Sequence, residues 1–480
     1  MKLSEFLKKT GYLDNFNFNE HEIHNVMVNS SERKQNSVFF ALRGIKKDGH
    51  DFIEEAVNNG AVLCIGERED IINEKYIFDK NLRKNINKYS NLIYGNPAES
   101  LILTGVTGTN GKTSVTYIIE NLLKSLNFKT GRAGTINADT IKQLYDVKNT
   151  FPEGPLFISY LAECRDYGGE HFVTEVSSHA LELGRTDFID FNFGVWTNLT
   201  QDHMDFHQNM DNYFNSKKKL FQKILNSPKA LKGGVVNYDC SYGRKIIDFY
   251  SNKFDVLTYG FSQGADLRIE ECRLNQKFYE IKFSYLEDDY LIKTNLFGNY
   301  NALNIMASIG LLLLNNIKIE NIIKTDFKNI NIPGRMERIR SGEVDVFIDY
   351  AHTPDALENV LKNLKLIYDK IVIVFGCGGD RDKSKRPVMG RIASENCLQC
   401  IVTDDNPRSE PADKIAQDII EGMKKKNYTH IPDRREAILK GREIAYELKA
   451  ALLIAGKGHE TYQEKAGVKK YFSDKEVFNI

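Results

Sequence analysis

The chain has 480 residues, of which 41% are hydrophobic and 27% are charged, values that are ordinary for a globular protein. This length exceeds what a single hydrophobic core holds, so we expect two or three domains. Lys plus Arg and Asp plus Glu both number 65, which gives a formal net charge of zero. Because a general nucleic-acid or membrane-surface binder carries a basic excess, we expect no nucleic-acid partner and no stable membrane insertion.

The first residues lack the apolar core of a signal peptide, and no apolar run approaches the roughly 18 residues of a membrane span. The seven cysteines follow no disulfide framework, and the one CxxC pair, Cys397 and Cys400, has no second pair. Such a pair is more typical of small residues near a helix end than of a metal or redox site. These features predict that the protein works in the reducing cytoplasm. We also expect a monomer, although no sequence feature determines the oligomeric state.

The first region, residues 1–97, has the pattern of a small α/β domain. The run SVFFALRG at 37–44 predicts a strand, and GHDFIEEAVNNGA at 49–61 predicts a helix. The stretch NLIYGNPAES at 91–100 predicts a linker, because Gly-Asn-Pro breaks regular structure.

The next feature is the glycine-rich stretch GVTGTNGKTS at 105–114, which follows an apolar strand and precedes a helical pattern at 113–126. A phosphate-binding loop requires this order, because the helix N-terminus supplies N–H donors. Its glycines allow a close approach of phosphate, Lys112 neutralises charge, and Thr113 offers a hydroxyl to magnesium. Val106, however, stands where the usual phosphate loop has a glycine.

The middle region, within 98–331, alternates between strand-like and helix-like segments and predicts a mostly parallel sheet with helices on both faces. Glu175 ends one strand, where its carboxylate either holds magnesium or forms an ordinary salt bridge. The stretch TNLTQDHMDFH at 197–207 carries Asp202, His203, Asp205 and His207. A zinc site, a polar surface turn and a turn whose His203 meets a hard cation all remain open interpretations.

Three consecutive lysines, Lys217 to Lys219, lie in a helical pattern at 210–225. A run of this kind is most often a solvated helix face. Helical spacing nevertheless brings Tyr213 and Lys217 together with the apolar Leu220 and Phe221, so one lysine should point inward. An inward lysine is costly unless its charge is paired or chemically changed.

The last region, residues 332–480, predicts a second, Rossmann-like α/β domain. Four loops, DYAHTPDAL, GCGGDRDKSKRP, TDDNPR and AGKGHE, each follow a predicted strand and should lie at one carboxyl-end edge of a sheet. Arg381 and Arg408 are forked donors suited to a carboxylate, and Glu460 is an acceptor for an ammonium group. Together they predict a pocket for a zwitterionic molecule such as an amino acid.

Eight strings taken together resemble the Mur ligase family: GTNGKTS, EVSSHAL, TNLTQDHMDFH, PGRME, DYAHTPDAL, GGDRD, DNPR and GKGHE. The resemblance covers nearly the whole chain, is weakest over the first domain, and is closest to the members that form a UDP-N-acetylmuramoyl tripeptide. It implies an α/β protein with a uridine-binding domain at 1–97, a phosphate-loop ATP-binding domain at 98–331 and an amino-acid-binding domain at 332–480. The family's first functional loop glycine falls at Gly108, so Val106 is no defect.

The resemblance implies an ATP-dependent amide ligase of peptidoglycan precursor synthesis that uses Mg²⁺. In this family the D-glutamate carboxylate of a UDP-muramoyl dipeptide attacks the γ-phosphate of ATP, and an amino acid then displaces phosphate from the acyl phosphate. DNPR is the family's mark for a meso-diamino-diacid, and meso-diaminopimelate and meso-lanthionine both remain open. The alternatives are the same reaction with L-lysine, a ligase resembling folylpolyglutamate synthetase, and a non-catalytic nucleotide sensor.

The resemblance also implies roles for individual residues. The catalytic residues would be Lys112, Glu175, His203 and a carbamylated Lys217, with the metal held by Thr113, Glu175, His203 and Lys217. ATP contacts would come from Gly108, Thr109, Asn110, Gly111, Lys112, Thr113, Ser114, Asn301, Arg335, Asp349 and His352. The UDP-precursor would meet Ser30, Thr150, Ser177 and Arg185, and the amino acid Arg381, Asp405, Asn406, Pro407, Arg408, Gly456 and Glu460.

Two motifs depart from the family pattern. The usual Asp-Ser-Arg of the uridine loop is Asn29, Ser30 and Ser31 here, and the usual Thr-Thr-Pro is Thr150, Phe151 and Pro152. Only Ser30 and Thr150 are therefore carried over from these two motifs.

Overall fold

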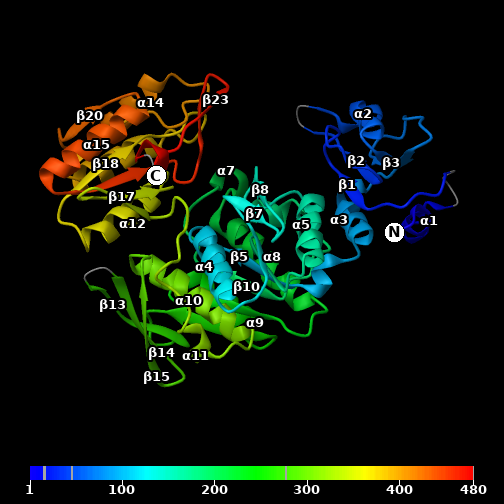
Figure 1. Cartoon of the computed structure of the whole chain (residues 1–480), viewed down its shortest axis with the longest axis horizontal. Coiled ribbons are helices and arrows are strands. Elements are labelled where there is room, and N and C mark those ends of the chain that lie inside the picture. The colour runs from blue at the N-terminus through cyan, green and yellow to red at the C-terminus, as the bar shows by residue number, and fades with distance from the viewer. Residues whose placement is uncertain (14–17, 45–46, 276–277, 479–480) are drawn as a thin grey trace. The chain divides into compact units, whose positions relative to one another are not determined.

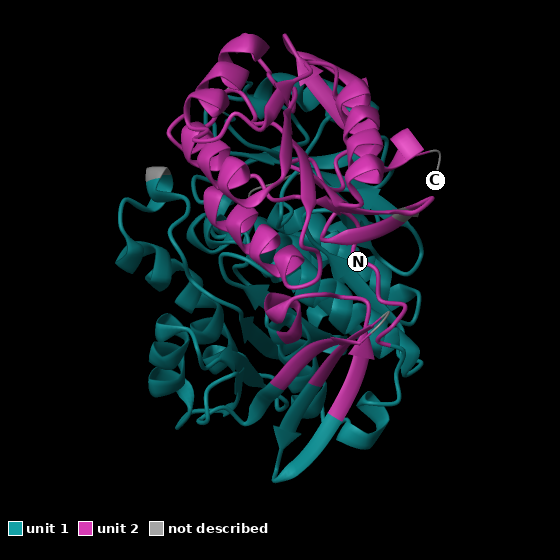
Figure 2. Cartoon of the chain, turned by 90° about the vertical axis from the view of Figure 1, so that its left-hand side faces the viewer, with its two compact units in different colours: residues 1–270, 282–290, 303–326 teal, residues 271–281, 291–302, 327–480 magenta. Residues whose placement is uncertain are grey.

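We describe the chain from a computed structural model, which covers residues 1–13, 18–44, 47–275 and 278–478. The chain divides into two compact units, coloured separately in Figure 2. Unit 1 comprises residues 1–270, 282–290 and 303–326, and unit 2 comprises residues 271–281, 291–302 and 327–480. Within the described residues, no helix is both long enough and apolar enough to cross a membrane.

The first part of unit 1 is a four-stranded parallel sheet in the order β1-β2-β3-β4. The elements are α1 (Leu3–Thr10), β1 (Asn25–Met27), β2 (Ser37–Ala41), α2 (Ile53–Asn58), β3 (Ala61–Gly66), β4 (Tyr76–Phe78) and α3 (Leu82–Tyr94). Every residue of β2 is buried, because Val38 and Phe40 pack with α1 and α3 while Phe39 and Ala41 pack with α2. A sheet covered on both faces explains the unbroken apolar run. The predicted strand and helix are confirmed.

The predicted linker at 91–100 is wrong over its first four residues, which belong to α3. The helix ends at Gly95, whose left-handed φ of 67° forms the C-cap, and the short 3₁₀ helix η3 (Pro97–Ser100) follows. Buried Asn87 of α3 donates from Nδ2 to the carbonyls of Gly184, Arg185 and Asp187 at 3.2, 3.1 and 3.1 Å. Asn91, the first residue of the predicted linker, likewise donates to the carbonyl of Phe188, and composition alone does not reveal these long-range contacts.

The centre of unit 1 is an eleven-stranded sheet in the order β15-β14-β13-β12-β11-β10-β5-β9-β6-β7-β8. Strands β12, β11, β10, β5, β9 and β6 run parallel, while β7 and β8 add an antiparallel edge, so the predicted mostly parallel sheet is confirmed. In Figure 1, α4 lies in front of β5 and α8 behind it.

The elements of this sheet and its helices have the following bounds: β5 (Ile102–Thr107), α4 (Lys112–Ser125), β6 (Thr130–Ala133), β7 (Asn137–Asp139), β8 (Leu144–Asp146), α5 (Gly154–Asp166), β9 (His171–Glu175), α6 (Ser178–Glu182), β10 (Phe193–Trp196), α7 (Met204–His207), α8 (Met210–Asn226), β11 (Gly233–Asn237), α9 (Ser241–Tyr250), β12 (Asp255–Gly260), β13 (Leu267–Asn275), β14 (Phe278–Tyr285), β15 (Asp288–Thr294), α10 (Asn299–Leu314) and α11 (Ile319–Ile322).

Unit 2 contains a six-stranded sheet in the order β16-β17-β21-β18-β19-β20. All pairings are parallel except β16 with β17. The elements are β16 (Glu337–Ser341), β17 (Val344–Asp349), α12 (Pro354–Lys365), β18 (Ile371–Phe375), α13 (Lys385–Asn396), β19 (Gln399–Val402), α14 (Ala412–Glu421), β20 (Tyr428–His430), α15 (Arg434–Leu448), β21 (Ala451–Ala455), the hairpin β22 (Tyr462–Lys465) and β23 (Val468–Tyr471), and η4 (Lys475–Phe478). The predicted placement of four loops at one edge is confirmed, because β17, β18, β19 and β21 are parallel neighbours.

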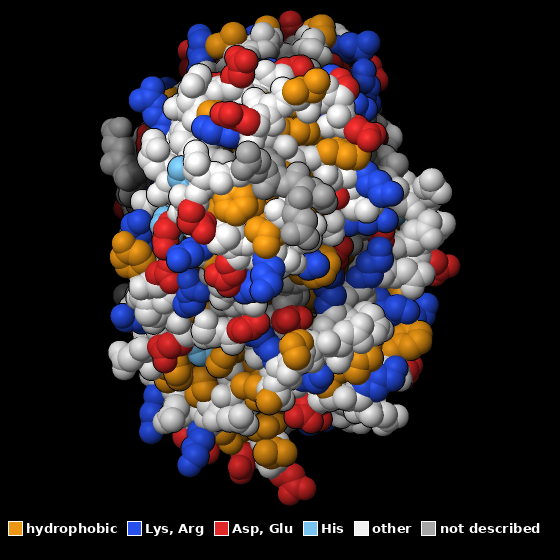
Figure 3. All heavy atoms as spheres, turned by 90° about the vertical axis from the view of Figure 1, so that its right-hand side faces the viewer, with side chains coloured by type: hydrophobic (Ala, Val, Ile, Leu, Met, Phe, Trp, Pro, Cys, Tyr) orange, Lys and Arg blue, Asp and Glu red, His pale blue; other side chains and the backbone are white. Residues whose placement is uncertain are grey.

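The distribution of surface charge agrees with the balanced composition, because basic and acidic side chains are interspersed over the face drawn in Figure 3.

The cysteines form no disulfide. All seven are free, and Cys397 and Cys400 are both buried. Burial raises the pKa of the Cys397 thiol well above its ordinary value, which keeps the thiol protonated and supports a structural role.

We expect Asn87→Ala to lower the thermal unfolding midpoint, because three carbonyls of the 184–187 turn lose a buried donor. One buried group of this kind contributes about 2 kcal/mol, which corresponds to a few degrees in a melting curve. Differential scanning calorimetry measures the shift. Lys84→Ala, at an exposed position of the same helix, is the matched control. Equal melting of both variants and the wild type contradicts the assignment.

Candidate active site

The phosphate-type loop lies between β5 and α4, as the sequence predicts. Gly108 has a φ of 147°, and Gly111, the N-cap of α4, has a φ of 89°. A Cβ atom at Gly108 would lie 1.9 Å from Thr197 Oγ1, and one at Gly111 would lie 2.6 Å from Asn304 Oδ1. Glycine is therefore required at both positions by backbone conformation and by space.

The loop that follows β10 holds the phosphate-type loop in shape. Thr197 Oγ1 donates to the carbonyl of Asn110 at 2.6 Å. Asn198 accepts from the backbone N–H of Asn110 through Oδ1 and from that of Thr109 through its own carbonyl, both at 2.9 Å. This explains why TNLT follows directly after a buried strand: its polar side chains bind a neighbouring backbone.

Two lysines converge on this loop. Lys112 Nζ donates to the carbonyls of Gly108 and Thr109 at 3.0 and 2.7 Å, and Lys217 Nζ donates to that of Gly108 at 2.8 Å. Lys217 is only 2% exposed, whereas Lys218 is half-buried and Lys219 is exposed, so the predicted inward lysine is confirmed. Burial, and next the charge of Lys112, lower the pKa of Lys217 well below its ordinary value.

Glu175 ends β9 and is 1% exposed. Its Oε1 accepts from Thr113 Oγ1 at 3.0 Å and from the N–H of Thr135 at 2.7 Å, and its Oε2 accepts from Thr135 Oγ1 at 3.0 Å. The carboxylate and the Thr113 hydroxyl are hard oxygen donors, which fit a magnesium ion beside phosphates. Sequence reasoning missed Thr135, although Gly-Thr directly after the short strand β6 is a signal that could have identified it.

His203 contacts Asp202 and His179. It is exposed, has a φ of 55° at the start of α7, and places Nε2 3.4 Å from Asp202 Oδ2. Its ring centroid is 4.9 Å from that of His179. Among the described residues, no group of three or more His, Cys, Asp or Glu side chains is arranged to hold a metal. The side chain of Asp205 lies outside the described residues.

The residues expected to meet the precursor's peptide lie at loops of the central sheet. Ser177 caps α6 by accepting from the N–H of Ala180 at 3.2 Å. Arg185 pairs with Glu153 at 2.6 Å and donates to the carbonyl of Phe151 at 3.3 Å. Thr150 Oγ1 lies 3.2 Å from Thr135 Oγ1.

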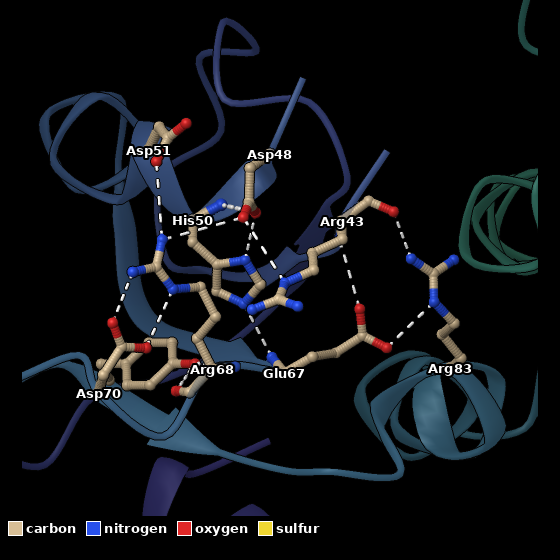
Figure 4. Close-up of polar contacts among 9 residues, drawn as sticks. Arg43, Asp48, His50, Asp51, Glu67, Arg68, Asp70 and Arg83 are labelled. Carbon is tan, nitrogen blue, oxygen red and sulfur yellow. Dashed lines mark hydrogen bonds and ion pairs between the residues drawn. The ribbon is translucent and has the colours of Figure 1, made fainter. Parts of the chain in front are cut away.

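Ser30, the remaining precursor residue, belongs to the four-stranded part, where its hydroxyl donates to Glu55 at 2.7 Å. Nearby, Figure 4 shows a polar network that joins the turn after β2 to the end of β3. Buried His50 contacts Asp48 through Nδ1 at 2.5 Å and accepts from the N–H of Glu67 through Nε2 at 2.8 Å. Arg68 pairs with Asp70 at 2.6 Å. The network fixes two loops at the carboxyl edge of this sheet.

In unit 2, three of the residues expected to contact ATP, Arg335, Asp349 and His352, lie around the end of β17. The Asp349 carboxylate accepts from the N–H groups of Met336 and Ala351 at 2.7 and 2.8 Å, and burial raises its pKa. The Arg335 guanidinium lies 4.5 Å from the ring centroid of Tyr350, and His352 Nδ1 lies 2.9 Å from the Tyr350 carbonyl. Buried Asn301 donates to the carbonyl of Phe297 at 2.9 Å.

The expected amino-acid residues occupy three loops of the same sheet. Asn406 Nδ2 donates to Glu460 Oε2 at 2.8 Å, and fully buried Lys457 donates to the same oxygen at 3.1 Å. Arg408 Nη1 donates to the carbonyl of Gly379 at 2.7 Å, and Arg381 is exposed on the adjacent loop. Sequence reasoning missed Lys457, although a lysine between two glycines after a buried strand is a usable signal.

Two buried arginines form ion pairs that hold these loops in place. Arg386 pairs with Glu410 at 3.0 Å and with Asp418 at 2.8 Å, and its hydrogen bond to Glu410 lowers the pKa of that carboxyl to about 2. Glu410 in turn accepts from the N–H of Asp380 at 2.7 Å.

The second arginine, Arg434, pairs with Asp474 at 2.7 Å and lies 3.9 Å from Asp405. Gly456 lies against Asp405, since a Cβ atom there would be 2.7 Å from Asp405 Oδ2. The Pro407 carbonyl would be 1.9 Å from a Cβ atom at Gly379. The close packing leaves no room for side chains at either glycine.

We expect Gly108→Ala to weaken nucleoside triphosphate binding by at least about tenfold, because backbone strain and the clash with Thr197 each cost about 1–3 kcal/mol. Isothermal titration calorimetry with a non-hydrolysable ATP analogue measures the change. Gly11→Ala is the matched control, because Gly11 also has a positive φ but no atom within 4 Å of the added Cβ. Unchanged affinity in Gly108→Ala would refute the role of this loop.

Three family models match the chain: "Mur ligase family, catalytic domain" at residues 22–100, "Mur ligase middle domain" at 106–312 and "Mur ligase, glutamate ligase domain" at 334–458. A Clostridium tetani protein is 39% identical, with 99% of this chain and 98% of the relative covered, and one from Aquifex aeolicus is 38% identical, with 94% and 92% covered. Both are named UDP-N-acetylmuramoyl-L-alanyl-D-glutamate–2,6-diaminopimelate ligase. A solved structure of a ligase of that name has a TM-score of 0.66 at 29% identity, covering 95% of this chain and 94% of its own. The chain belongs to the Mur ligase family.

Proposed function

We propose that the chain is an ATP-dependent amide ligase of the MurE type, which joins meso-diaminopimelate to UDP-N-acetylmuramoyl-L-alanyl-D-glutamate in peptidoglycan precursor synthesis. The proposal rests on two sites that this one chain carries. One is a phosphate loop with Glu175 and two lysines, and the other is a set of loops with two arginines and Glu460. The names of the relatives point to the same substrates.

The reaction needs ATP because a carboxylate oxygen is a poor leaving group. The D-glutamate carboxylate oxygen attacks the γ-phosphorus, ADP leaves, and an acyl phosphate forms. The amine nitrogen of the amino acid then attacks the acyl carbon, and phosphate leaves with that oxygen as the amide forms. Lys112, which donates to two loop carbonyls, would turn its ammonium to the phosphate oxygens, and the N–H groups at the start of α4 would hold them.

We propose that magnesium is held by Thr113 and Glu175, with His203 and Lys217 completing the metal positions. A buried carboxylate with a threonine hydroxyl at 3.0 Å is the donor chemistry that this ion prefers. When bound, magnesium offsets the negative charge on the transferring phosphoryl group. Gly108, Thr109, Asn110, Gly111 and Ser114 would contact the phosphates, and Asn301, Arg335, Asp349 and His352 would make further ATP contacts.

Lys217 is proposed to be carbamylated. Burial and the charge of Lys112 lower the pKa of Lys217, which favours the neutral amine, the form that reacts with carbon dioxide. The amine nitrogen bonds to the carbon of carbon dioxide and releases one proton to solvent, and the product is a carbamate anion, which would remove the repulsion from Lys112 and would hold a second magnesium ion through an oxygen. The modification therefore relieves the cost of burying a lysine here.

The precursor and amino-acid contacts are also proposals. Ser30, Thr150, Ser177 and Arg185 would bind the UDP-precursor. Arg381, Asp405, Asn406, Pro407, Arg408, Gly456 and Glu460 would bind the diamino acid. We further propose domains at 1–97, 98–331 and 332–480, in a monomer that works in the cytoplasm.

The amino-acid pocket is expected to select for a second carboxylate. Arg408 would hold the distal carboxylate and Glu460 the distal ammonium, so L-lysine would leave Arg408 without a substrate carboxylate. A ligase acting on meso-diaminopimelate or the isosteric meso-lanthionine should release ADP with either diacid at a kcat/KM at least about 100-fold above that for L-lysine or L-ornithine. A coupled ADP assay across the four amino acids measures this. Faster turnover with L-lysine than with both diacids contradicts the proposal.

The same assay tests the alternatives. A nucleotide sensor would release no ADP that depends on both precursor and amino acid. A folylpolyglutamate-synthetase-like ligase would accept a folate and glutamate instead of the muramoyl dipeptide.

We expect Lys217→Ala to lower kcat by at least about 100-fold, since a charge near the transferring phosphate is lost. Acetate or propionate at millimolar concentration should restore part of the activity by supplying the missing carboxylate. Lys219→Ala, at an exposed position two residues away, should behave like the wild type. Full activity of Lys217→Ala without added acid rules out the carbamate.

A further inference from the structure

Thr135 contacts Glu175 through both its backbone and its side chain. We propose that Thr135 is a positioning residue that fixes the metal-binding carboxylate of Glu175 and links it to Thr150 on the side of the acceptor substrate. The inference rests on the proposed function, since it assumes that Glu175 holds the metal and that Thr150 faces the precursor.

The position of Thr135 follows from the sheet. Strands β6 and β9 are parallel neighbours, with Ala133 opposite Thr174. Both strands therefore end at the same edge of the sheet, and the segment Gly134–Thr135 runs past Glu175. A Cβ atom at Gly134 would lie 2.2 Å from Glu175 Oε1, so the carboxylate fills the space that any other residue there would need.

The contacts fix both carboxylate oxygens. Glu175 Oε1 accepts from the N–H of Thr135 at 2.7 Å, and Oε2 accepts from Thr135 Oγ1 at 3.0 Å. With one residue holding both oxygens, the carboxylate cannot rotate freely about its terminal bond. The remaining lone pair of Oε1 then faces Thr113, whose hydroxyl is 3.0 Å away at the start of α4. Thr135 thereby sets the direction in which Glu175 offers its oxygen to a cation.

The hydroxyl of Thr135 also meets Thr150, with the two oxygens 3.2 Å apart. An ionised carboxylate only accepts hydrogen bonds, and a hydroxyl has a single proton. When Thr135 donates to Glu175, the Thr150 hydroxyl must supply the proton between the two threonines. The resulting chain runs from Thr150 through Thr135 to Glu175, so a change at the metal carboxylate alters the orientation of the Thr150 hydroxyl.

The test compares Thr135→Val, which removes the hydroxyl at nearly constant volume, with Thr135→Ser, which keeps it. Binding of Mn²⁺ together with a non-hydrolysable ATP analogue is followed by electron paramagnetic resonance, without any ligase turnover. We expect Thr135→Val to weaken Mn²⁺ binding about tenfold, as for the loss of one charge-assisted hydrogen bond. Thr135→Ser should remain within about twofold of the wild type.

The matched control is Thr130→Val, a buried threonine at the other end of β6. It should leave Mn²⁺ binding unchanged, which separates a local role of Thr135 from a general effect on the strand. Circular dichroism melting confirms that each variant is folded. Thr150→Val should raise KM for the UDP-precursor without weakening Mn²⁺ binding, and combining it with Thr135→Val should raise that KM by less than the product of the two single effects.

Wild-type Mn²⁺ affinity in Thr135→Val overturns the inference, as does a serine variant as weak as the valine variant. Independent effects of Thr135→Val and Thr150→Val on KM overturn the link between them. If the wild type binds Mn²⁺ with the nucleotide analogue but releases no ADP with diaminopimelate, the proposed function fails while the metal measurement still judges the role of Thr135.

Discussion

The Nζ atoms of Lys112 and Lys217 both donate to one backbone carbonyl, that of Gly108, and this convergence is the constraint on which the nucleotide site depends. The charge of Lys112 favours an anion at the start of α4, where helix N–H groups already favour one. The surrounding elements maintain the arrangement, because α8 turns one of its three lysines inward and the loop after β10 fixes the backbone to which both lysine side chains bind. Glu175 is held at the same edge by Thr135, so the site contains its own counter-charge at a fixed place.

The amino-acid loops use buried ion pairs for a related purpose. Arg386 and Arg434 are fully buried. Arg386 forms an ion pair with Glu410, and Arg434 forms one with Asp474, so each arginine connects two segments that are distant in the sequence. Removing one partner of such a pair leaves an uncompensated charge, which is more destabilising than the pair itself is stabilising. The ion pairs therefore fix the positions of the loops. The loops in turn orient the side chains of Asn406, Arg408 and Glu460.

The sequence predicted the fold correctly wherever a local pattern of apolar and polar residues is compatible with only one type of secondary structure. Unbroken apolar runs such as 371–375 became parallel strands, and helical spacing was enough to turn Lys217 inward. The contacts of Thr135, Lys457 and Asn87 were not predicted, because each depends on which elements become neighbours. Thr135 meets Glu175 across 40 positions only because β6 is adjacent to β9. The linker error has the same cause, since Asn91, in the extra turn of α3, donates to the carbonyl of Phe188, 97 residues away.

The anchoring of α3 on the 184–188 turn bears on how the chain can be recombined. A segment ending near residue 95 looks exchangeable, because a glycine and a proline follow it. Yet Asn87 and Asn91 supply donors to a turn that carries Arg185, so a graft from a relative without these amides would leave buried carbonyls unmatched in the recipient. Productive chimeras should therefore transfer residues 82–95 together with the 184–188 turn, so that the junction follows the hydrogen bonds and not the order of the chain.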